Sequence, residues 1–138
     1  MKKYIPFYAM LFLVVTGCAS VVQEEEVVSV EQQGTRIVQA IIAENYKEFI
    51  AGANDASAGG NDAESFLASC KQLENTYGTP GAFRYLGQLQ TPLLVNQLYA
   101  IKFKRKGENN KIIEHEQLLQ LIFGQDNGKY KLLGMRFM

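Results

Sequence analysis

The spacing of apolar residues changes at Pro80 and Gly81, and this change constrains the fold more than any other feature of the sequence. Before it, apolar residues recur every three to four positions, which is typical of amphipathic helices. After it, apolar and polar residues alternate, which is typical of strands with one buried face. Helices followed by strands predict an α+β domain in which the helices cover one face of an antiparallel sheet.

Two helices are predicted, and the first covers about 30–52. Gly34 costs about 1 kcal/mol relative to Ala inside a helix, which favours an ordered start at Thr35. The apolar residues that fall on one face of this helix are Val38, Ile41, Ile42, Tyr46, Phe49 and Ala53. Such a face requires a partner surface, which the strands can provide.

The second predicted helix follows a loop of small and polar residues over 54–60. A capping box of Asn61 and Glu64 marks its start, and Gly78 marks its end. Its buried stripe is Phe66, Cys70, Leu73 and Tyr77. No basic neighbour of Cys70 is evident that would lower the pKa of its thiol, so we expect this cysteine to pack as a small core hydrophobe.

Four strands are predicted over 82–90, 93–106, 111–123 and 129–138, with turns at 91–92, 107–110 and 127–128. One face of the second strand is mostly apolar and should meet the helices; it carries Val95, Gln97, Tyr99, Ile101 and Phe103. The sequence therefore predicts a single α+β domain over 30–138, with two N-terminal helices packed on a curved antiparallel sheet of about four strands.

The N-terminal segment predicts export. Lys2 and Lys3 precede an apolar run from Ile5 to Val15, which is shorter than the roughly twenty residues of a transmembrane helix and is typical of a signal peptide. The residues Val15-Thr16-Gly17-Cys18 resemble the lipobox of bacterial lipoproteins, in which the cysteine is lipidated and becomes the first residue of the mature protein.

This resemblance implies a division of the chain and a place in the cell. Residues 1–17 would be removed as a lipoprotein signal peptide, Cys18 would carry palmitate-like acyl chains, and 18–29 would be a lipidated, solvated tether. The protein would be exported and anchored to the cell envelope. Because Ala19 rather than Asp follows the cysteine, the resemblance implies the periplasmic side of the outer membrane if the host is Gram-negative.

A second resemblance concerns the domain itself. Two helices, a long sheet region and a last strand over 128–137 resemble the nuclear-transport-factor-two-like superfamily, a cystatin-like α+β cone, including exported lipoproteins whose domain has no known function. The resemblance implies a pocket between helices and sheet. The candidates to line it are Tyr46, Phe49, Phe66, Tyr77, Tyr99, Phe103 and His115.

No catalytic residue can be assigned by this resemblance, because no residue matches a catalytic motif. His115 is the only histidine, and in a strand the adjacent Glu114 and Glu116 point to the opposite face, so neither can orient it. One histidine without a cysteine pair at ligand spacing predicts no metal site. The absence of phosphate-loop and nucleophile-elbow motifs predicts no cofactor.

The charge balance argues against nucleic acid as a partner. Without Lys2 and Lys3 the chain has 12 basic and 14 acidic residues, whereas a nucleic-acid-binding surface requires a basic excess on one face. We expect a lipid-anchored, non-enzymatic module that binds an unidentified protein or small ligand. Two alternatives stay open: a pocket enzyme with His115 as general base, and a structural subunit that forms homodimers.

The lipid anchor can be tested at Cys18. The variant Cys18→Ala has no sulfur to accept a diacylglyceryl group, so we expect it to lose incorporation of labelled acyl chains and to leave the membrane fraction. The measurement is acyl labelling followed by sedimentation of membranes. Undiminished sedimentation of Cys18→Ala with membrane lipid would show that the anchor assignment is wrong.

Overall fold

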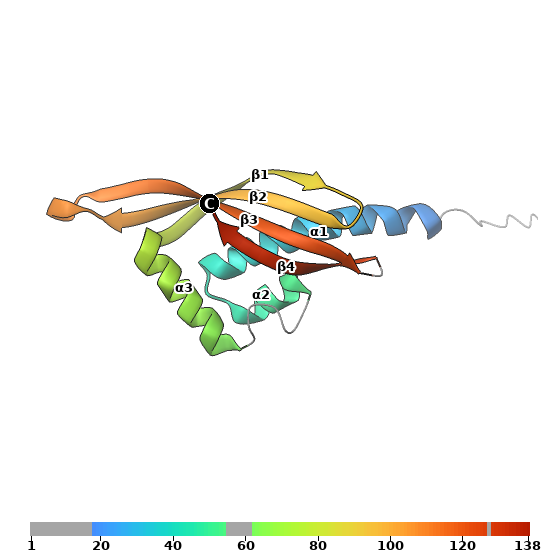
Figure 1. The fold of residues 1–138 in the computed structure, drawn as a ribbon, viewed down its shortest axis with the longest axis horizontal. Helices are drawn as coiled ribbons and strands as arrows, with labels where there is room; N and C mark the ends of the chain where they lie inside the picture. The colour runs from blue at the N-terminus through green and yellow to red at the C-terminus, as the bar shows by residue number, and fades with distance from the viewer. Residues whose placement is uncertain (1–17, 55–61, 127) are drawn as a thin grey trace, which may run out of the picture.

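The computed structural model describes residues 18–54, 62–126 and 128–138. These form an α+β arrangement of three α-helices and one open antiparallel sheet with the strand order β1-β2-β3-β4 (Figure 1). The helices are α1 (Cys18–Ile42), α2 (Tyr46–Ala53) and α3 (Ala63–Tyr77). The strands are β1 (Thr79–Gln90), β2 (Leu94–Lys106), β3 (Ile112–Asp126) and β4 (Lys129–Phe137), with a short 3-10 turn, η2 (Glu108–Asn110), between β2 and β3.

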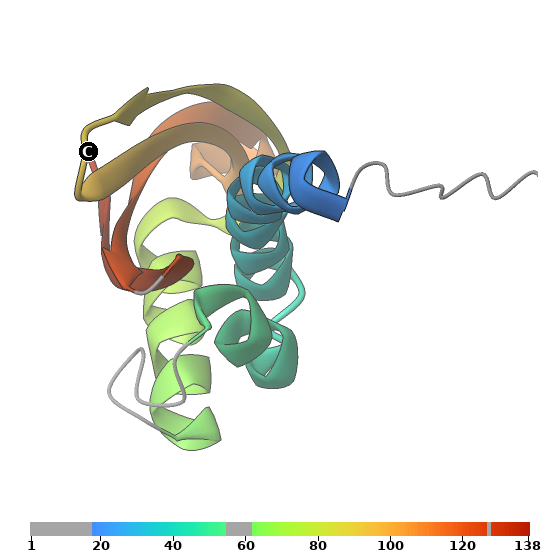
Figure 2. The ribbon, with the colours of Figure 1, turned by 90° about the vertical axis from the view of Figure 1, so that its right-hand side faces the viewer.

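The sheet curls over α1, and α2 and α3 lie on the same side of it (Figure 2). The buried face of β2 is the one predicted, because Val95, Gln97, Tyr99, Ile101 and Phe103 are each at most 1% exposed. From β3, Leu119, Leu121 and Phe123 join this core, and α1 contributes residues such as Ile37 and Val38. The strand bounds agree closely with the prediction except that β1 begins at Thr79 rather than at 82 and β3 ends at Asp126 rather than at 123.

The prediction of one helix over 30–52 is wrong in its extent. The helix α1 ends at Ile42 and α2 begins at Tyr46, because Glu44 adopts a left-handed conformation (φ 53°) and the Asn45 side chain caps α2 by accepting a hydrogen bond from the Glu48 N–H at 3.2 Å. At the other end α1 begins at Cys18, so its backbone is helical through the segment expected as a tether. The fold therefore has three helices where two were predicted.

The end of α3 is confirmed at Gly78. Its φ of 104° is a backbone conformation that residues with a side chain rarely adopt. Its start is capped by Asp62, whose carboxylate accepts a hydrogen bond from the Ser65 N–H at 2.6 Å. The predicted leader over 1–17, most of the predicted loop, Asn61 and Asn127 lie outside the described residues. Asp126 pairs with Lys129, and Gly128 has a φ of 76°, as a tight hairpin requires.

A buried amide positions α1 on the sheet. The Gln97 side chain is inaccessible to solvent; its Nε2 donates to the Val30 carbonyl at 3.0 Å and to Gln88 Oε1 at 3.3 Å, and its Oε1 accepts from the Tyr99 hydroxyl at 3.1 Å. Gly34 lies directly opposite, where a Cβ atom would overlap Gln97 Oε1 and the Tyr99 hydroxyl. Gly34 is therefore an interior residue of α1 that allows close helix-to-sheet packing, not a helix start.

Replacing Gly34 by Ala should destabilise the protein. Overpacking a core costs about 1–3 kcal/mol, which exceeds the gain of up to about 1 kcal/mol from the better helix propensity of Ala. The measurement is the free energy of unfolding in urea. In a Gln97→Ala background the same change should cost less, because the overlapping amide is gone; an unchanged cost there would contradict this account of Gly34.

Candidate functional site

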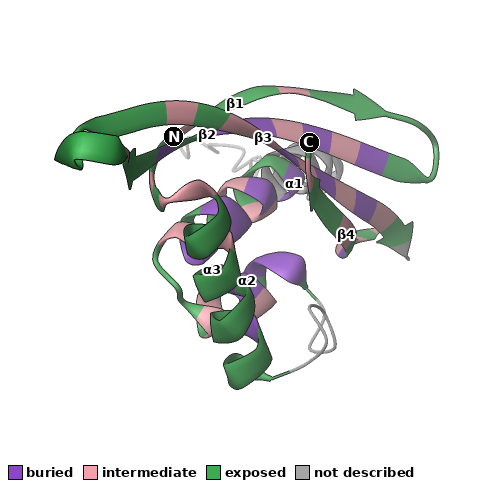
Figure 3. Ribbon diagram, turned by 60° about the vertical axis from the view of Figure 1, so that its left-hand side comes forward, coloured by how far each residue is buried: buried purple, intermediate pink, exposed green. Residues whose placement is uncertain are grey.

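The helix α3 stands away from the sheet and is poorly covered. Its residues are mostly exposed (Figure 3). Of the predicted buried stripe, only Phe66 and Cys70 are buried, while Leu73 and Tyr77 are half-buried. The apolar face of α3 is therefore turned inward without enough protein to cover it.

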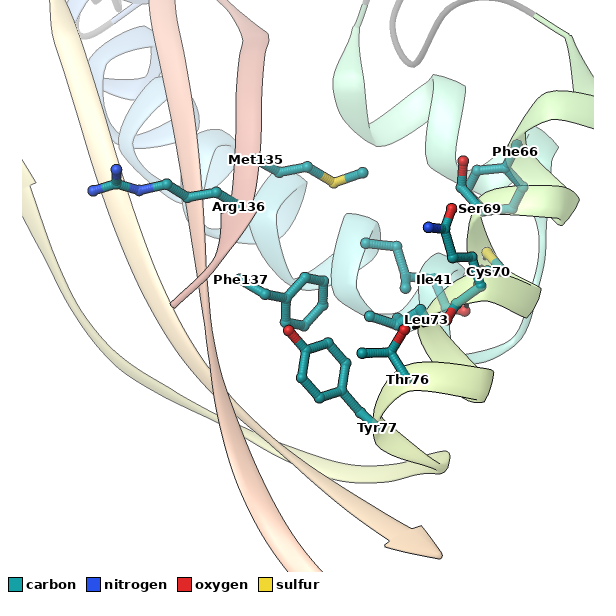
Figure 4. Close-up of a pocket in the computed structure, with 11 residues that line it drawn as sticks. Ile41, Phe66, Ser69, Cys70, Leu73, Thr76, Tyr77, Met135, Arg136 and Phe137 are labelled. Atoms are coloured by element: carbon teal, nitrogen blue, oxygen red, sulfur yellow. Dashed lines mark hydrogen bonds between the residues drawn. The ribbon is translucent and has the colours of Figure 1, made fainter.

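A groove of about 340 Å³ lies between α3 and the last residues of β4. Figure 4 shows Met135 reaching from β4 toward α3, and the rings of Tyr77 and Phe137 meeting with their centroids 5.6 Å apart. The lining residues are Ile41, Phe66, Ser69, Cys70, Gln72, Leu73, Thr76, Tyr77, Met135, Arg136 and Phe137. Most of these side chains are apolar, so the groove presents a largely hydrophobic wall.

The single charged residue in this lining, Arg136, does not place its charge in the groove. Its side chain points away from the groove (Figure 4), and its Nε donates to Gln120 Oε1 at 2.7 Å. The other polar side chains that line the groove, which come from Ser69, Gln72, Thr76 and Tyr77, carry no charge. The groove provides no charge to pair with an ionic ligand.

The polar groups of the groove differ in their availability. Ser69 and Thr76 donate their hydroxyls to carbonyls one turn back, at Ser65 and Gln72. The Tyr77 hydroxyl and the Gln72 side-chain amide make no hydrogen bond to any residue that the structure describes. These two lining groups are available to bind a ligand in the groove.

A second hollow, of about 290 Å³, lies on the other side of α3, toward the α1–α2 connection. Ile41, Cys70 and Leu73 line both hollows, and Glu44 and Glu74 line the second alone. Hollows therefore lie on both sides of the contact that Cys70 and Leu73 of α3 make with Ile41 of α1.

Cys70 is buried in the core, as the sequence predicted, with its Sγ 3.9 Å from the Ile41 carbonyl oxygen. Burial raises the pKa of the Cys70 thiol to about 11, and the nearby Glu44 carboxylate adds to the shift. A thiol with such a pKa is almost entirely protonated at neutral pH and is a poor nucleophile.

The structure separates the predicted pocket residues into three groups. Phe66 and Tyr77 line the groove. Tyr46 packs on Phe66 with a centroid distance of 5.7 Å and stays outside the lining. Phe49, Tyr99 and Phe103 are at most 1% exposed and form the core.

His115 also lies outside the groove. Its ring stacks on Phe103 at 5.9 Å and lies 6.5 Å from the Tyr77 ring. Glu114 and Glu116 instead pair with Lys104 and Arg84 at 3.2 and 2.9 Å, respectively. Within the described ranges His115 makes neither a hydrogen bond nor an ion pair, so the geometry gives it no acid to orient it.

Sequence reasoning missed Met135 and Phe137, although the alternation of the last strand places both on the face of Leu121 and Leu119, their partners in β3. In the part of the chain that the structure describes, no group of three or more His, Cys, Asp or Glu residues could hold a metal ion. No helix there is both long and apolar enough to cross a membrane.

No protein-family model matches this chain, and no curated protein matches it. The two resemblances drawn from the sequence therefore stay predictions.

The burial of Cys70 can be tested through the pH dependence of the alkylation rate of its thiol. In the Cys18→Ala variant Cys70 is the only cysteine, so alkylation by iodoacetamide reads it alone. Because the reactive form is the thiolate, the rate should be low at pH 8 and should rise until the pH passes about 11. A rate that levels off near pH 8.5, the value of a free thiol, would contradict the buried position.

Proposed function

We propose that this protein is a non-enzymatic, lipid-anchored module of the cell envelope that binds a small, uncharged apolar ligand in the groove between α3 and β4. The observation that carries the proposal is the uncovered apolar face of α3 next to Met135 and Phe137. A helix normally buries such a face against other elements. A ligand in the groove would complete that packing.

The size and chemistry of the groove set the class of ligand. A volume of about 340 Å³ lies at the small end of the range of about 300–1,000 Å³ for ligand pockets. The wall is apolar, the Arg136 charge is directed elsewhere, and the Tyr77 hydroxyl and the Gln72 amide are available. These features favour a compact apolar molecule with one or two hydrogen-bonding groups.

The anchor and the fold family are further parts of the proposal. The lipobox-like residues before Cys18 support the lipid anchor, and export to the envelope follows from it. The curled sheet with its helices on the inner side supports the resemblance to the nuclear-transport-factor-two-like cone, since that resemblance predicts a pocket between helices and sheet (Figure 2). A pocket enzyme is less well supported, because His115 lies outside the groove and its ring lies beside the rings of Phe103 and Tyr77 rather than beside a carboxylate that pairs with it.

The groove can be tested with the neutral dye N-phenyl-1-naphthylamine, which fluoresces in apolar surroundings. The background is Cys18→Ala, which carries no acyl chains to compete for the dye. Met135→Trp places a larger ring in the groove and should weaken dye binding at least about tenfold, the factor that about 1.4 kcal/mol represents. The matched control is Leu67→Trp, because Leu67 lies on α3, is 44% exposed against 40% for Met135, and does not line the groove.

The dye titration distinguishes the possible results, with far-ultraviolet circular dichroism showing that both variants are folded. Saturable binding that Met135→Trp weakens and Leu67→Trp leaves intact supports the groove as the ligand site. Equal loss in both variants, or no saturable binding in the parent chain, would show that the groove does not hold an apolar ligand.

A further inference from the structure

The turn between β1 and β2 exposes leucine side chains to solvent instead of burying them in the core. Leu89 is 68% exposed, Leu93 72% and Leu94 38%. The turn is nevertheless well fixed. The Thr91 N–H donates to the Leu94 carbonyl at 2.8 Å, the Leu94 N–H donates to Thr91 Oγ1 at 3.1 Å, and the Leu93 carbonyl accepts from the Gln125 N–H at 3.2 Å. A rigid turn thus holds leucine side chains in solvent.

The β1–β2 and β2–β3 turns, which lie at opposite ends of the sheet, differ in charge. From Leu86 to Ile101 the sequence contains no charged residue. At the opposite end, the strands around the β2–β3 turn carry Lys102, Lys104, Arg105 and Lys106 together with Glu108 and Glu114. The leucine-bearing β1–β2 turn is uncharged, whereas the β3–β4 hairpin at the same end of the sheet carries Asp126 and Lys129. The turn is therefore the part of this end that an apolar phase would accept, because charged groups resist transfer out of water.

The N-terminal end of α1 extends in the same direction along the long axis of the molecule as this turn (Figure 1), although the two lie on opposite sides in Figure 2. The Val30 carbonyl is bonded to Gln97, and further along α1 Ile41 reaches Cys70 at the groove. Going back from Val30, α1 runs past the level of the turn along this axis (Figure 1). The twelve residues from Cys18 to Val30 span about 18 Å as a helix, whereas Gln97 and Leu93 are about 13 Å apart along an extended chain. Cys18 can therefore reach the level of the turn or beyond it.

We infer that the β1–β2 turn is a bilayer-contact site, at which Leu89, Leu93 and Leu94 enter the boundary between headgroups and acyl chains. The inference rests on the lipid anchor of the proposed function, because the acyl chains on Cys18 bring this end of the domain to the lipid. The anchor and the turn together would then hold the domain in one orientation, whereas a lipid on a flexible segment alone would not.

The acidic residues between anchor and domain restrict how deep this contact is. Glu24, Glu25 and Glu26 follow Cys18 within α1, and a glutamate row does not enter hydrocarbon at low cost. The inferred contact is therefore shallow and confined to the turn. It requires no anionic lipid, and zwitterionic phosphatidylcholine is the appropriate test surface.

The chain contains no tryptophan, so a single introduced tryptophan reports its own position. The full-length lipidated protein is reconstituted into phosphatidylcholine vesicles as Leu93→Trp and, as the matched control, as Ile112→Trp. Ile112 is 61% exposed and begins β3 at the opposite end of the sheet. Flotation of the vesicles measures anchoring, and phosphatidylcholine brominated on its acyl chains quenches only tryptophans that contact hydrocarbon.

We expect both variants to float, the emission of Leu93→Trp to shift to the blue and be quenched by the brominated lipid, and that of Ile112→Trp to do neither. Floating protein without quenching at position 93, or with equal quenching at both positions, overturns the contact site and leaves the anchor intact. A blue shift without bromine quenching, together with a dimeric mass in detergent, would assign the leucines to a second copy of the chain and also overturn it. If neither variant floats, the lipid anchor fails and the contact site fails with it.

Discussion

The side-chain amide of Gln97 is the interaction on which the placement of the helices depends. It lies near the start of β2 with no access to solvent, donates to the Val30 carbonyl and accepts from the Tyr99 hydroxyl. A buried polar group left without its partner costs about 1–3 kcal/mol, so α1 has one favourable position on the sheet. The helix α2 is held in turn by α1, because Gln33 Nε2 donates to the Gly52 carbonyl at 3.2 Å. The position of a single strand residue thus fixes two helices.

The groove is a consequence of how differently α1 and α3 are held. The C-terminal end of α3 is fixed tightly, because a Cβ on Gly78 would overlap the Lys104 carbonyl oxygen on β2. From there α3 runs away from the sheet (Figure 1). Toward its other end it is held by Cys70 near the Ile41 carbonyl and by the ring contacts of Phe66 with Phe49 and Tyr46. The space between a helix fixed at one end and a curled sheet is a wedge, and Met135 and Phe137 form its other wall.

The sheet could be predicted well from the sequence and the helices less well, for physical reasons. Alternating residues such as those from Val95 to Phe103 have one interpretation once turn residues bound them. The break after Ile42 was missed because Ile41, Ile42, Tyr46 and Phe49 keep helical spacing across it, while the cause is the local backbone at Glu44. Aromatic side chains suggested the site, but packing assigns Phe49, Tyr99 and Phe103 to the core. The groove depends on the angle of α3, which no local pattern encodes.

The low burial of α3 also affects how readily this helix opens. A segment with few buried side chains opens at a lower free energy than the whole domain unfolds. Since Phe66 and Cys70 are its only buried residues, we expect α3 to open while α1 and the sheet keep their contacts. Entry of a ligand into the groove and its release would then depend on the opening of this one helix. The backbone amides of α3 would exchange their hydrogens with solvent sooner than those of β2.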